Sequence, residues 1–475
     1  MTSSLFPPSR LVRPLVLLTL PILLGACAGR DYVMPPTGLM SEAEIEAEWS
    51  VDRAWWKAYR DPALNTLVDA ALRNNVDLAK SAIAVNRALY QARQVGADLV
   101  PEFSAGGDAA TTLNAKTGDS SESYGSNLGI SYELDLWRKL RDAASAQEWE
   151  YKATEQDRES ARLALINNVI DAYYNLQYVR QAQEVTRRSI EFYEELYRIV
   201  NDKYRAGKVD GLEPITAEQS LLAARNNLMD LERQQKTGEQ TLRNLLNLGP
   251  DAELDIPAVD LLAVRPPSPD LDAPLSALGL RPDVRAAEYR IQEAFKNWEA
   301  DKAALYPSVT LGGSLSVSSN SVDTLFSVPF LGGTLKINLP FLQWNKVRWN
   351  VRISESQFEE RKLDFAQTLT TALNEVDTYW YSYENAVALL ANMEKKHEAD
   401  VRIGAYRETR YNLGADELKD WVQARNTAND SMLSVLKGKY NVIEYVNAVF
   451  QAMGGRLVPR SGGAENVPIS SPAAI

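Results

Sequence analysis

The segment LGISYELDL, residues 128–136, is followed at once by Trp137-Arg138-Lys139 and carries the clearest structural signal in the chain. Its apolar residues alternate with polar or small ones, which is typical of a β-strand with one apolar face. After Trp137 the pattern changes, because residues 138–206 contain neither proline nor glycine. As one continuous helix this stretch would be about 100 Å long. The sequence therefore predicts a strand that leads directly into a very long helix.

The same arrangement occurs a second time. The segment LKINLPFLQWNK, residues 335–346, also alternates and reaches a tryptophan, Trp344, before a second predicted helix at 346–411. Further anchors recur about 206 residues apart: Asp77 and Asp283, Pro101 and Pro307, Tyr204 and Tyr411, Gly207 and Gly414, and Gly249 and Gly455. We interpret this self-similarity as a duplication within one architecture.

Each copy contains a predicted β-hairpin, at 102–136 and at 308–341. Each arm has about the ten residues that a tilted transmembrane strand needs. Four strands cannot close a barrel, and open strand edges in lipid would leave backbone groups unsatisfied at several kcal/mol each. Several chains must therefore share one barrel: two copies would give eight strands and a filled interior, three would give twelve and a lumen. A soluble sandwich is a weaker alternative, because the rest of the chain is helical.

The long helices carry apolar residues at alternating spacings of three and four, which is the pattern of a coiled-coil seam. Two such series are Ile190, Tyr193, Tyr197, Val200 and Tyr204, and Val376, Trp380, Tyr383, Val387 and Leu390. We interpret them as packing surfaces between neighbouring helices. The predicted fold class is therefore mainly α with a transmembrane β-barrel contribution, in which each chain supplies four β-strands and long coiled-coil-like helices from two internal repeats.

The predicted organisation follows from these elements. A signal peptide at 1–26 is followed by a lipid-anchored N-terminal segment at 27–60. The first repeat, at 61–264, contains a helix up to about Val100, hairpin 102–136, long helix 138–206 and helix 212–248. After a Pro-rich linker at 265–274, the second repeat, at 275–455, contains a helix, hairpin 308–341, long helix 346–411 and helix 416–453, and a disordered tail follows at 456–475.

The N-terminus has the features of an export signal. Arg10 and Arg13 precede an apolar run, Leu15 to Leu24, which is too short to span a membrane. The run ends in Leu-Gly-Ala-Cys27, and Cys27 is the one cysteine of the chain. This tetrapeptide resembles the bacterial lipobox, in which the cysteine is acylated, for example by palmitate, and becomes the mature N-terminus. Ordinary cleavage after Ala26 would instead leave a free, exposed thiol.

Composition excludes several classes of function. The formal charge is −12 and the pI about 5.0, and no Lys/Arg run offsets this charge, so we expect no nucleic-acid partner. One cysteine and one histidine, His397, exclude disulfide scaffolds, thiolate zinc sites and any mechanism that needs two imidazoles. No pair of carboxylates stands out as a general acid and base. We therefore expect no catalytic residues, no metal and no cofactor, and not an enzyme.

Taken together, these residues resemble the TolC-like outer-membrane channel family, in its branch of multidrug efflux lipoproteins. The resemblance covers nearly the whole chain and is carried by Leu280-Arg-Pro-Asp-Val284, by Tyr306-Pro-Ser308, by Pro340-Phe341 with Trp344, and by the two Tyr-x-x-Gly turns. It implies a homotrimer with a 12-stranded β-barrel that is continuous with a periplasmic α-helical barrel. It also implies that this trimer, in the outer-membrane lipid of a Gram-negative cell, passively conducts small molecules such as drugs and so contributes to multidrug resistance.

The resemblance also implies partners and site residues. The partners are a periplasmic adaptor (membrane-fusion) protein and an inner-membrane transporter, of the RND type in preference to the ABC type. The turns at the far ends of the long helices are the expected adaptor-docking tips, with Gly207, Lys208, Gly414 and Ala415; helix capping by glycine is the simpler alternative. The expected periplasmic gate comprises Tyr411, Glu213, Asp420 and Asp416, with a hydrogen bond from Tyr411 to Glu213 and charge compensation by Lys208 or Lys419.

Asp416 stands where family members have an arginine that pairs with the first-half carboxylate, so that inherited salt bridge cannot form here. Trp137 and Trp344 are expected at the membrane interface as part of an aromatic girdle, or else in core packing. Two alternative functions stay open at this point: an exit duct for type I protein secretion, and a non-conducting coiled-coil lipoprotein of the periplasm. A lipid-anchored enzyme has no catalytic constellation to support it.

Overall fold

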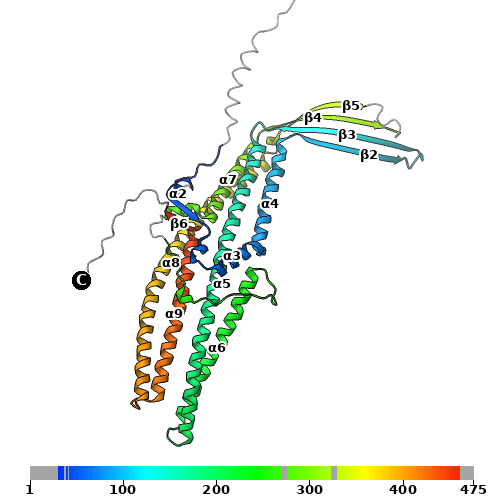
Figure 1. Cartoon of the computed structure of the whole chain (residues 1–475). Helices are drawn as coiled ribbons and strands as arrows, with labels where there is room; N and C mark the ends of the chain where they lie inside the picture. Colours follow the sequence, from blue (N-terminus) through cyan, green and yellow to red (C-terminus); the bar gives the residue numbers. More distant parts are fainter. Residues whose placement is uncertain (1–29, 37–38, 41, 270–274, 322–328, 460–475) are drawn as a thin grey trace, which may run out of the picture. The chain divides into compact units, whose positions relative to one another are not determined.

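The computed structural model describes residues 30–36, 39–40, 42–269, 275–321 and 329–459 (Figure 1). The predicted signal peptide, Cys27 and residues 460–475 lie outside these ranges. The chain divides into two units. The hairpin unit contains residues 30–35, 83–155 and 286–367, and the helical unit contains the other described residues. Among the helices described, none combines the length and the apolar character needed to cross a membrane.

The hairpin unit contains one four-stranded antiparallel sheet. Its strands are β2 (Glu102–Leu113), β3 (Ser120–Leu134), β4 (Ser308–Ser319) and β5 (Pro329–Asn338), in the order β2-β3-β4-β5 (Figure 1). The two hairpins are therefore joined through β3 and β4, with Tyr124 opposite Ser319 and Leu134 opposite Val309. Strands β2 and β5 are the two edges of this sheet.

One face of the sheet is apolar. The pairing places Phe103 opposite Ile130, Leu128 opposite Leu315, and Leu315 opposite Leu331, so these side chains share a face. They are nevertheless exposed, up to 87 % for Leu331. Mainly serine, threonine, glycine and charged residues alternate with them on the other face, which also carries Phe330. A sheet with one exposed apolar face and one polar face is typical of a strand set that borders lipid on one side.

The strand-to-helix junctions tie the two repeats together inside this unit. Trp137 follows β3, its indole nitrogen donates a hydrogen bond to the carbonyl oxygen of Pro307 at 2.9 Å, and its ring stacks on Tyr306 at 4.8 Å. Pro307 directly precedes β4. Trp344 begins the helix after the second hairpin and is exposed. Both tryptophans thus lie between a strand and the long helix that follows it, Trp137 three residues after β3 and Trp344 at the start of α8.

Long helices follow the hairpins. The helices described are α2 (Glu42–Glu48), α3 (Pro62–Asn74), α4 (Val76–Gly96), α5 (Lys139–Arg205), α6 (Leu212–Leu245), α7 (Pro282–Ala303), α8 (Trp344–Asn412) and α9 (Leu418–Ala452), with short 3-10 turns at Trp55–Tyr59, Ala97–Leu99, Leu261–Ala263, Leu275–Leu280 and Pro340–Gln343. In α5 the 67 residues run without interruption, which agrees with the absence of helix breakers.

The core of the helical unit is built on the middle of α5 and α9. Leu163, Ile166, Ile170, Tyr173 and Tyr174 from α5 are all 3 % exposed or less. Asn447 of α9 organises the polar part of this core. Its side-chain oxygen accepts hydrogen bonds from the Trp55 indole at 3.3 Å and the Tyr59 hydroxyl at 3.1 Å. The N-terminal aromatic residues thus belong to the core.

Two predicted boundaries were wrong. The helix expected from Asp61 to about Val100 is two helices, because Asn75 ends α3 and its side chain caps α4, accepting from the Asp77 and Leu78 amides at 3.0 Å each. Disorder was expected from residue 456 onwards, but Arg456–Pro459 forms strand β6. It pairs antiparallel with β1 (Trp49–Asp52), and this pairing satisfies its backbone groups.

Arg281 closes the second repeat within the helical unit. Its guanidinium forms two 2.8 Å hydrogen bonds to Asp283, one of 2.6 Å to Glu375 of α8, and one of 3.1 Å to the carbonyl oxygen of Ala452 at the end of α9. The residue is 8 % exposed. One buried side chain therefore connects α7, α8 and α9.

Arg281→Met should destabilise the protein by about 2 kcal/mol, because it leaves two carboxylates and a carbonyl without their donor while water reaches both carboxylates only in part. The measurement is the midpoint of chemical unfolding followed by helical circular dichroism. As a control, Arg225→Met removes an exposed ion pair with Glu194 and should cost below about 1 kcal/mol. Equal midpoints for the two variants would contradict this role for Arg281.

Candidate functional site

The two predicted docking turns have the same backbone structure. Gly207 and Gly414 have φ angles of 72° and 74°, in the left-handed region that favours glycine. The amide of the next residue then bonds back five residues, from Lys208 to Lys203 at 2.9 Å and from Ala415 to Arg410 at 2.8 Å. This is the pattern of a glycine-terminated helix. The glycines are thus required by the caps, whatever else the turns do.

An aromatic and aliphatic cluster joins the ends of α5, α6, α8 and α9 near these turns. Its buried members are Leu196, Val200, Ala217, Leu418 and Val422. Tyr411 stacks on Trp421 with ring centroids 5.3 Å apart, and Trp421 meets Phe192 edge-on at 6.5 Å. We refer to this cluster, with the two turns, as the tip. Trp421 was not identified from the sequence, although it lies one residue beyond Asp420.

One ion pair links the two repeats across the tip. The Lys419 ammonium lies 3.3 Å from a carboxylate oxygen of Glu213. The two side chains are 51 % and 38 % exposed. Of the two lysines considered for charge compensation, Lys419 thus forms an ion pair with Glu213. The hydrogen bond expected from Tyr411 to Glu213 is not formed, since Tyr411 lies against Trp421 instead.

Asp416 is held within its own repeat. Its carboxylate accepts hydrogen bonds from Arg410 at 2.8 Å and from Arg407 at 3.0 Å, and its side chain is only 5 % exposed. The hydrogen bond from Arg410 lowers the pKa of Asp416 below its usual value, and Arg407 adds to this effect. Two arginines near the end of α8, six and nine residues before Asp416, thus compensate its charge. By contrast, Asp420 is exposed.

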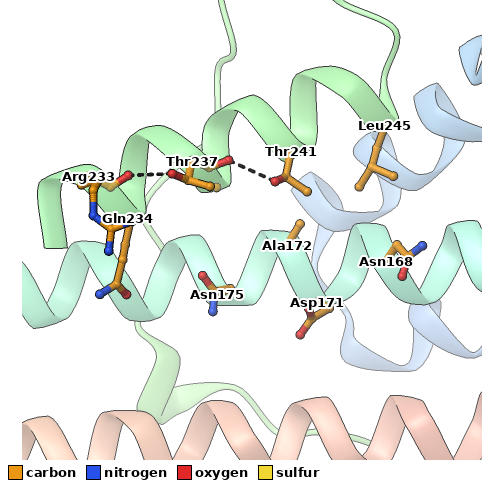
Figure 2. A pocket seen from close by; sticks show the side chains of 10 residues that line it. Asn168, Asp171, Ala172, Asn175, Arg233, Gln234, Thr237, Thr241 and Leu245 are labelled. Carbon is orange, nitrogen blue, oxygen red and sulfur yellow. Dashed lines mark hydrogen bonds between the residues drawn. The ribbon is translucent and has the colours of Figure 1, made fainter. Parts of the chain in front are cut away.

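A separate polar groove lies between α5 and α6 and has a volume of about 380 Å³ (Figure 2). The Thr237 and Thr241 hydroxyls that line it donate to backbone oxygens of their own helix. Asp171 points away from α6 in Figure 2 and accepts a 2.5 Å hydrogen bond from Tyr440, while burial raises the pKa of this carboxyl. The main polar groups of the groove therefore bond within the protein, and we assign it no ligand.

No metal centre assembles in the described residues. Within them, no three His, Cys, Asp or Glu side chains lie close enough together to hold a metal ion. His397 is partly buried, and its Nδ1 lies 3.0 Å from the Ser431 hydroxyl. This contact joins α8 to α9.

Comparison with known proteins identifies the family. The profile of the outer membrane efflux protein family matches residues 67–248 and 273–455, which are the two repeats. The chain belongs to this family. A related protein called toxin and drug export protein A, from Aggregatibacter actinomycetemcomitans, is 42 % identical over 91 % of this chain and 95 % of its own length. The pyoverdine export outer membrane protein OpmQ of Pseudomonas aeruginosa is 26 % identical over 94 % of this chain and 97 % of its own.

Solved structures agree with the fold of an outer membrane efflux protein. The outer-membrane channel OprN superposes with a TM-score of 0.78 at 22 % identity, covering 90 % of this chain and 99 % of its own. The CmeC channel of Campylobacter jejuni gives 0.76 at 24 % identity, covering 92 % and 94 %. The predicted fold class and family are thereby confirmed. The protein is an outer-membrane efflux channel and not an enzyme.

The Asp416 ion pairs predict a pH dependence at the second turn. Because the pKa of Asp416 is lowered, the pairs stabilise the turn above the usual carboxyl pKa of about 4 and are lost as pH falls through the lowered value. Hydrogen-exchange protection of the Gly414 and Ala415 amides, corrected for intrinsic rates, should fall only in that acid range. Asp416→Asn should lower this protection at neutral pH and remove its acid step. Asp420→Asn should retain the wild-type profile, and an identical profile in Asp416→Asn would refute the assignment.

Proposed function

We propose that three copies of this chain form a lipid-anchored exit duct that receives drugs or other small molecules from an inner-membrane transporter through a periplasmic adaptor. The observation that carries this proposal is the four-stranded sheet with its apolar face and its two edges, β2 and β5. Edge strands in lipid leave backbone donors and acceptors unsatisfied, so they require a partner strand. Twelve strands from three chains satisfy every edge and leave a lumen.

The anchor is part of the same proposal. Acylation of Cys27 would place the mature N-terminus at the membrane surface, and the barrel would hold the protein there as well. One relative supports this assignment by its name, the probable outer membrane lipoprotein SilC of Salmonella typhimurium. SilC is 27 % identical over 68 % of this chain and 71 % of its own length. An intact mass of the mature chain without acyl groups would rule out lipidation.

The tip is proposed as the gate of this duct. Glu213 and Lys419 form an ion pair that joins the two repeats at the tip, and each trimer would contain three such bridges. Asp416 is paired with Arg407 and Arg410, and Glu213 with Lys419, whereas Asp420 is exposed. We infer that the bridges hold the mouth closed and that Asp420 makes it cation-selective.

Single-channel conductance separates these two roles. Lys419→Met breaks the bridge but keeps both carboxylates, so the open fraction should rise while cation selectivity is retained. Glu213→Gln should raise the open fraction and weaken selectivity. An exposed pair contributes about 0.5 kcal/mol, and three acting together would shift the open fraction by roughly tenfold.

The complementary variant is Asp420→Asn, which should weaken cation selectivity and block by divalent cations while leaving the open fraction unchanged. Asp230→Asn, on an exposed part of α6, is the control for a surface charge far from the turns in sequence and should behave as wild type. Wild-type conductance for Lys419→Met and Glu213→Gln in assembled trimers would eliminate the bridge as a gate.

Docking of the adaptor is tested at the turns. A tryptophan side chain at Gly207 or Gly414 would cover the turn, and a β-carbon placed at either position would meet no atom of the rest of the chain within 4 Å. Both positions have positive φ, so Gly207→Asn and Gly414→Asn serve as matched controls that tolerate this backbone. Gly207→Trp and Gly414→Trp should abolish adaptor pull-down while the asparagine variants bind. Equal binding by all four would exclude the turns as the contact.

A protein-exporting duct is the second candidate. The 42 % identical relative is named for export of both toxins and drugs. Crosslinking in cells and identification of the inner-membrane partner distinguishes the two: an RND-type transporter would support drug efflux, and an ABC-type exporter would support type I secretion.

A further inference from the structure

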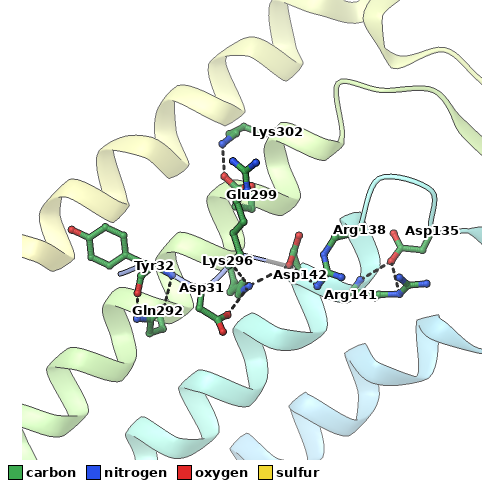
Figure 3. Close-up of polar contacts among 11 residues, drawn as sticks. Asp31, Tyr32, Asp135, Arg138, Arg141, Asp142, Gln292, Lys296, Glu299 and Lys302 are labelled. Atoms are coloured by element: carbon green, nitrogen blue, oxygen red, sulfur yellow. Dashed lines mark hydrogen bonds and ion pairs between the residues drawn. The ribbon is translucent and has the colours of Figure 1, made fainter. Parts of the chain in front are cut away.

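The hairpin unit contains a buried cation that the channel function does not use. Lys296 lies on α7, and its side chain is 3 % exposed. Its ammonium donates a 2.5 Å hydrogen bond to the carbonyl oxygen of Arg30 and lies 2.9 Å from the Asp31 carboxylate and 3.6 Å from Asp142 of α5 (Figure 3). A buried ammonium is costly unless its donors are satisfied, and two of its three acceptors here come from the N-terminal segment.

Tyr32, the next residue of the N-terminal segment, is also bound by α7. Gln292, one turn before Lys296 on α7, binds the backbone of Tyr32 twice: its side-chain nitrogen donates to the Tyr32 oxygen at 2.8 Å, and its side-chain oxygen accepts from the Tyr32 amide at 3.1 Å (Figure 3). This pairing imitates one step of a β-ladder. Gln292 is itself buried.

The Tyr32 side chain extends the contact to a third helix. Its ring meets Phe358 of α8 edge-on at 5.0 Å and lies 5.7 Å from Phe295 of α7. Phe358 in turn stacks on Trp298 at 5.7 Å. Residues 30–32 therefore contact α7 and α8 directly and reach α5 through Lys296. Helix α5 follows β3, α7 precedes β4, and α8 follows β5, so all three helices are continuous with hairpin strands.

We propose that Lys296, Gln292 and Phe358 form a binding site for the chain's own N-terminal segment, and that residues 30–32 act as a strap which holds together the three helices at the base of the hairpins. With the strap displaced, Lys296 would keep only the more distant Asp142. Residues 30–32 are therefore expected to bind cooperatively, because the contacts of Lys296, of Gln292 and of the Tyr32 ring all require the segment in the same position.

The strap also limits where an N-terminal anchor can reach. Arg30 is the third residue after Cys27 in the sequence, so their Cα atoms are at most about 11 Å apart. If Cys27 is acylated, the strap keeps its Cα atom within that distance of Arg30. This consequence rests on the proposed lipidation, whereas the strap itself does not.

Hydrogen exchange at the Tyr32 amide in the assembled protein tests the strap. Lys296→Met does not touch that amide, yet it should speed exchange there by about tenfold or more if the segment seats as a unit. Arg290→Met is the matched control, because Arg290 is also a cation of α7 that pairs with a carboxylate of α5, Glu150 at 3.5 Å. The contacts with residues 30–32 given above are made by other residues: Gln292, Phe295, Lys296 and Phe358. Arg290→Met should leave exchange at Tyr32 unchanged.

Asp31→Asn retains the Lys296–Asp142 pair and so provides a second variant if Lys296→Met fails to fold; it should also speed exchange at Tyr32. Wild-type exchange at Tyr32 in either folded variant overturns the strap. Cys27→Ala separates the strap from the proposed lipid anchor. If the Tyr32 amide stays protected from exchange in this variant, the strap binds without the anchor. If that protection is lost, binding of residues 30–32 depends on the anchor, and the proposal that the site binds the segment by itself is overturned.

Discussion

The pairing of β3 with β4 is the interaction on which the rest of the hairpin unit depends. These strands come from hairpins that belong to different repeats, yet their ladder runs from Tyr124–Ser319 to Leu134–Val309. Each hairpin alone would have two open edges, whereas the joined sheet has only β2 and β5 unpaired. The bond from Trp137 to Pro307 fixes the register where this ladder ends, because it joins a residue shortly after β3 to the residue before β4.

The duplication produces one shared apolar face. Two copies of a strand-and-helix unit place apolar residues on one face of a joined sheet, as in the cross-strand row of Ala105, Leu128, Leu315 and Leu331. The duplication is also visible at the tip, where Gly207 and Gly414 end α5 and α8 with equivalent caps. The repeats then differ where charge is concerned: Asp416 bonds to Arg407 and Arg410, while Glu213 bonds across to Lys419.

The two acids, Asp416 and Glu213, therefore contribute differently to the charge of the tip. An acid buried against two arginines contributes to the turn that carries it and little to the field at the mouth. An exposed pair such as Glu213–Lys419 is weak, which agrees with the proposal that it breaks when the duct opens. The ion pairs of the buried Lys296 in the hairpin unit differ from this exposed pair. Because Lys296 is buried, the loss of either acidic partner would cost much more free energy.

The sequence by itself determined the elements and the family: alternation defined the hairpins, the lack of proline and glycine defined α5, and the recurring anchors defined the repeats, because these patterns depend on local periodicity. It missed the break at Asn75, where one asparagine caps two helices, and the strand at 456–459, whose partner β1 lies in the N-terminal part of the chain. It placed Glu213, Asp416 and Asp420 at the tip but could not choose their partners. Only the tertiary structure decided that Lys419 pairs with Glu213 and that residues 30–32 lie on Lys296, because such contacts depend on which helix faces meet and not on spacing along the chain.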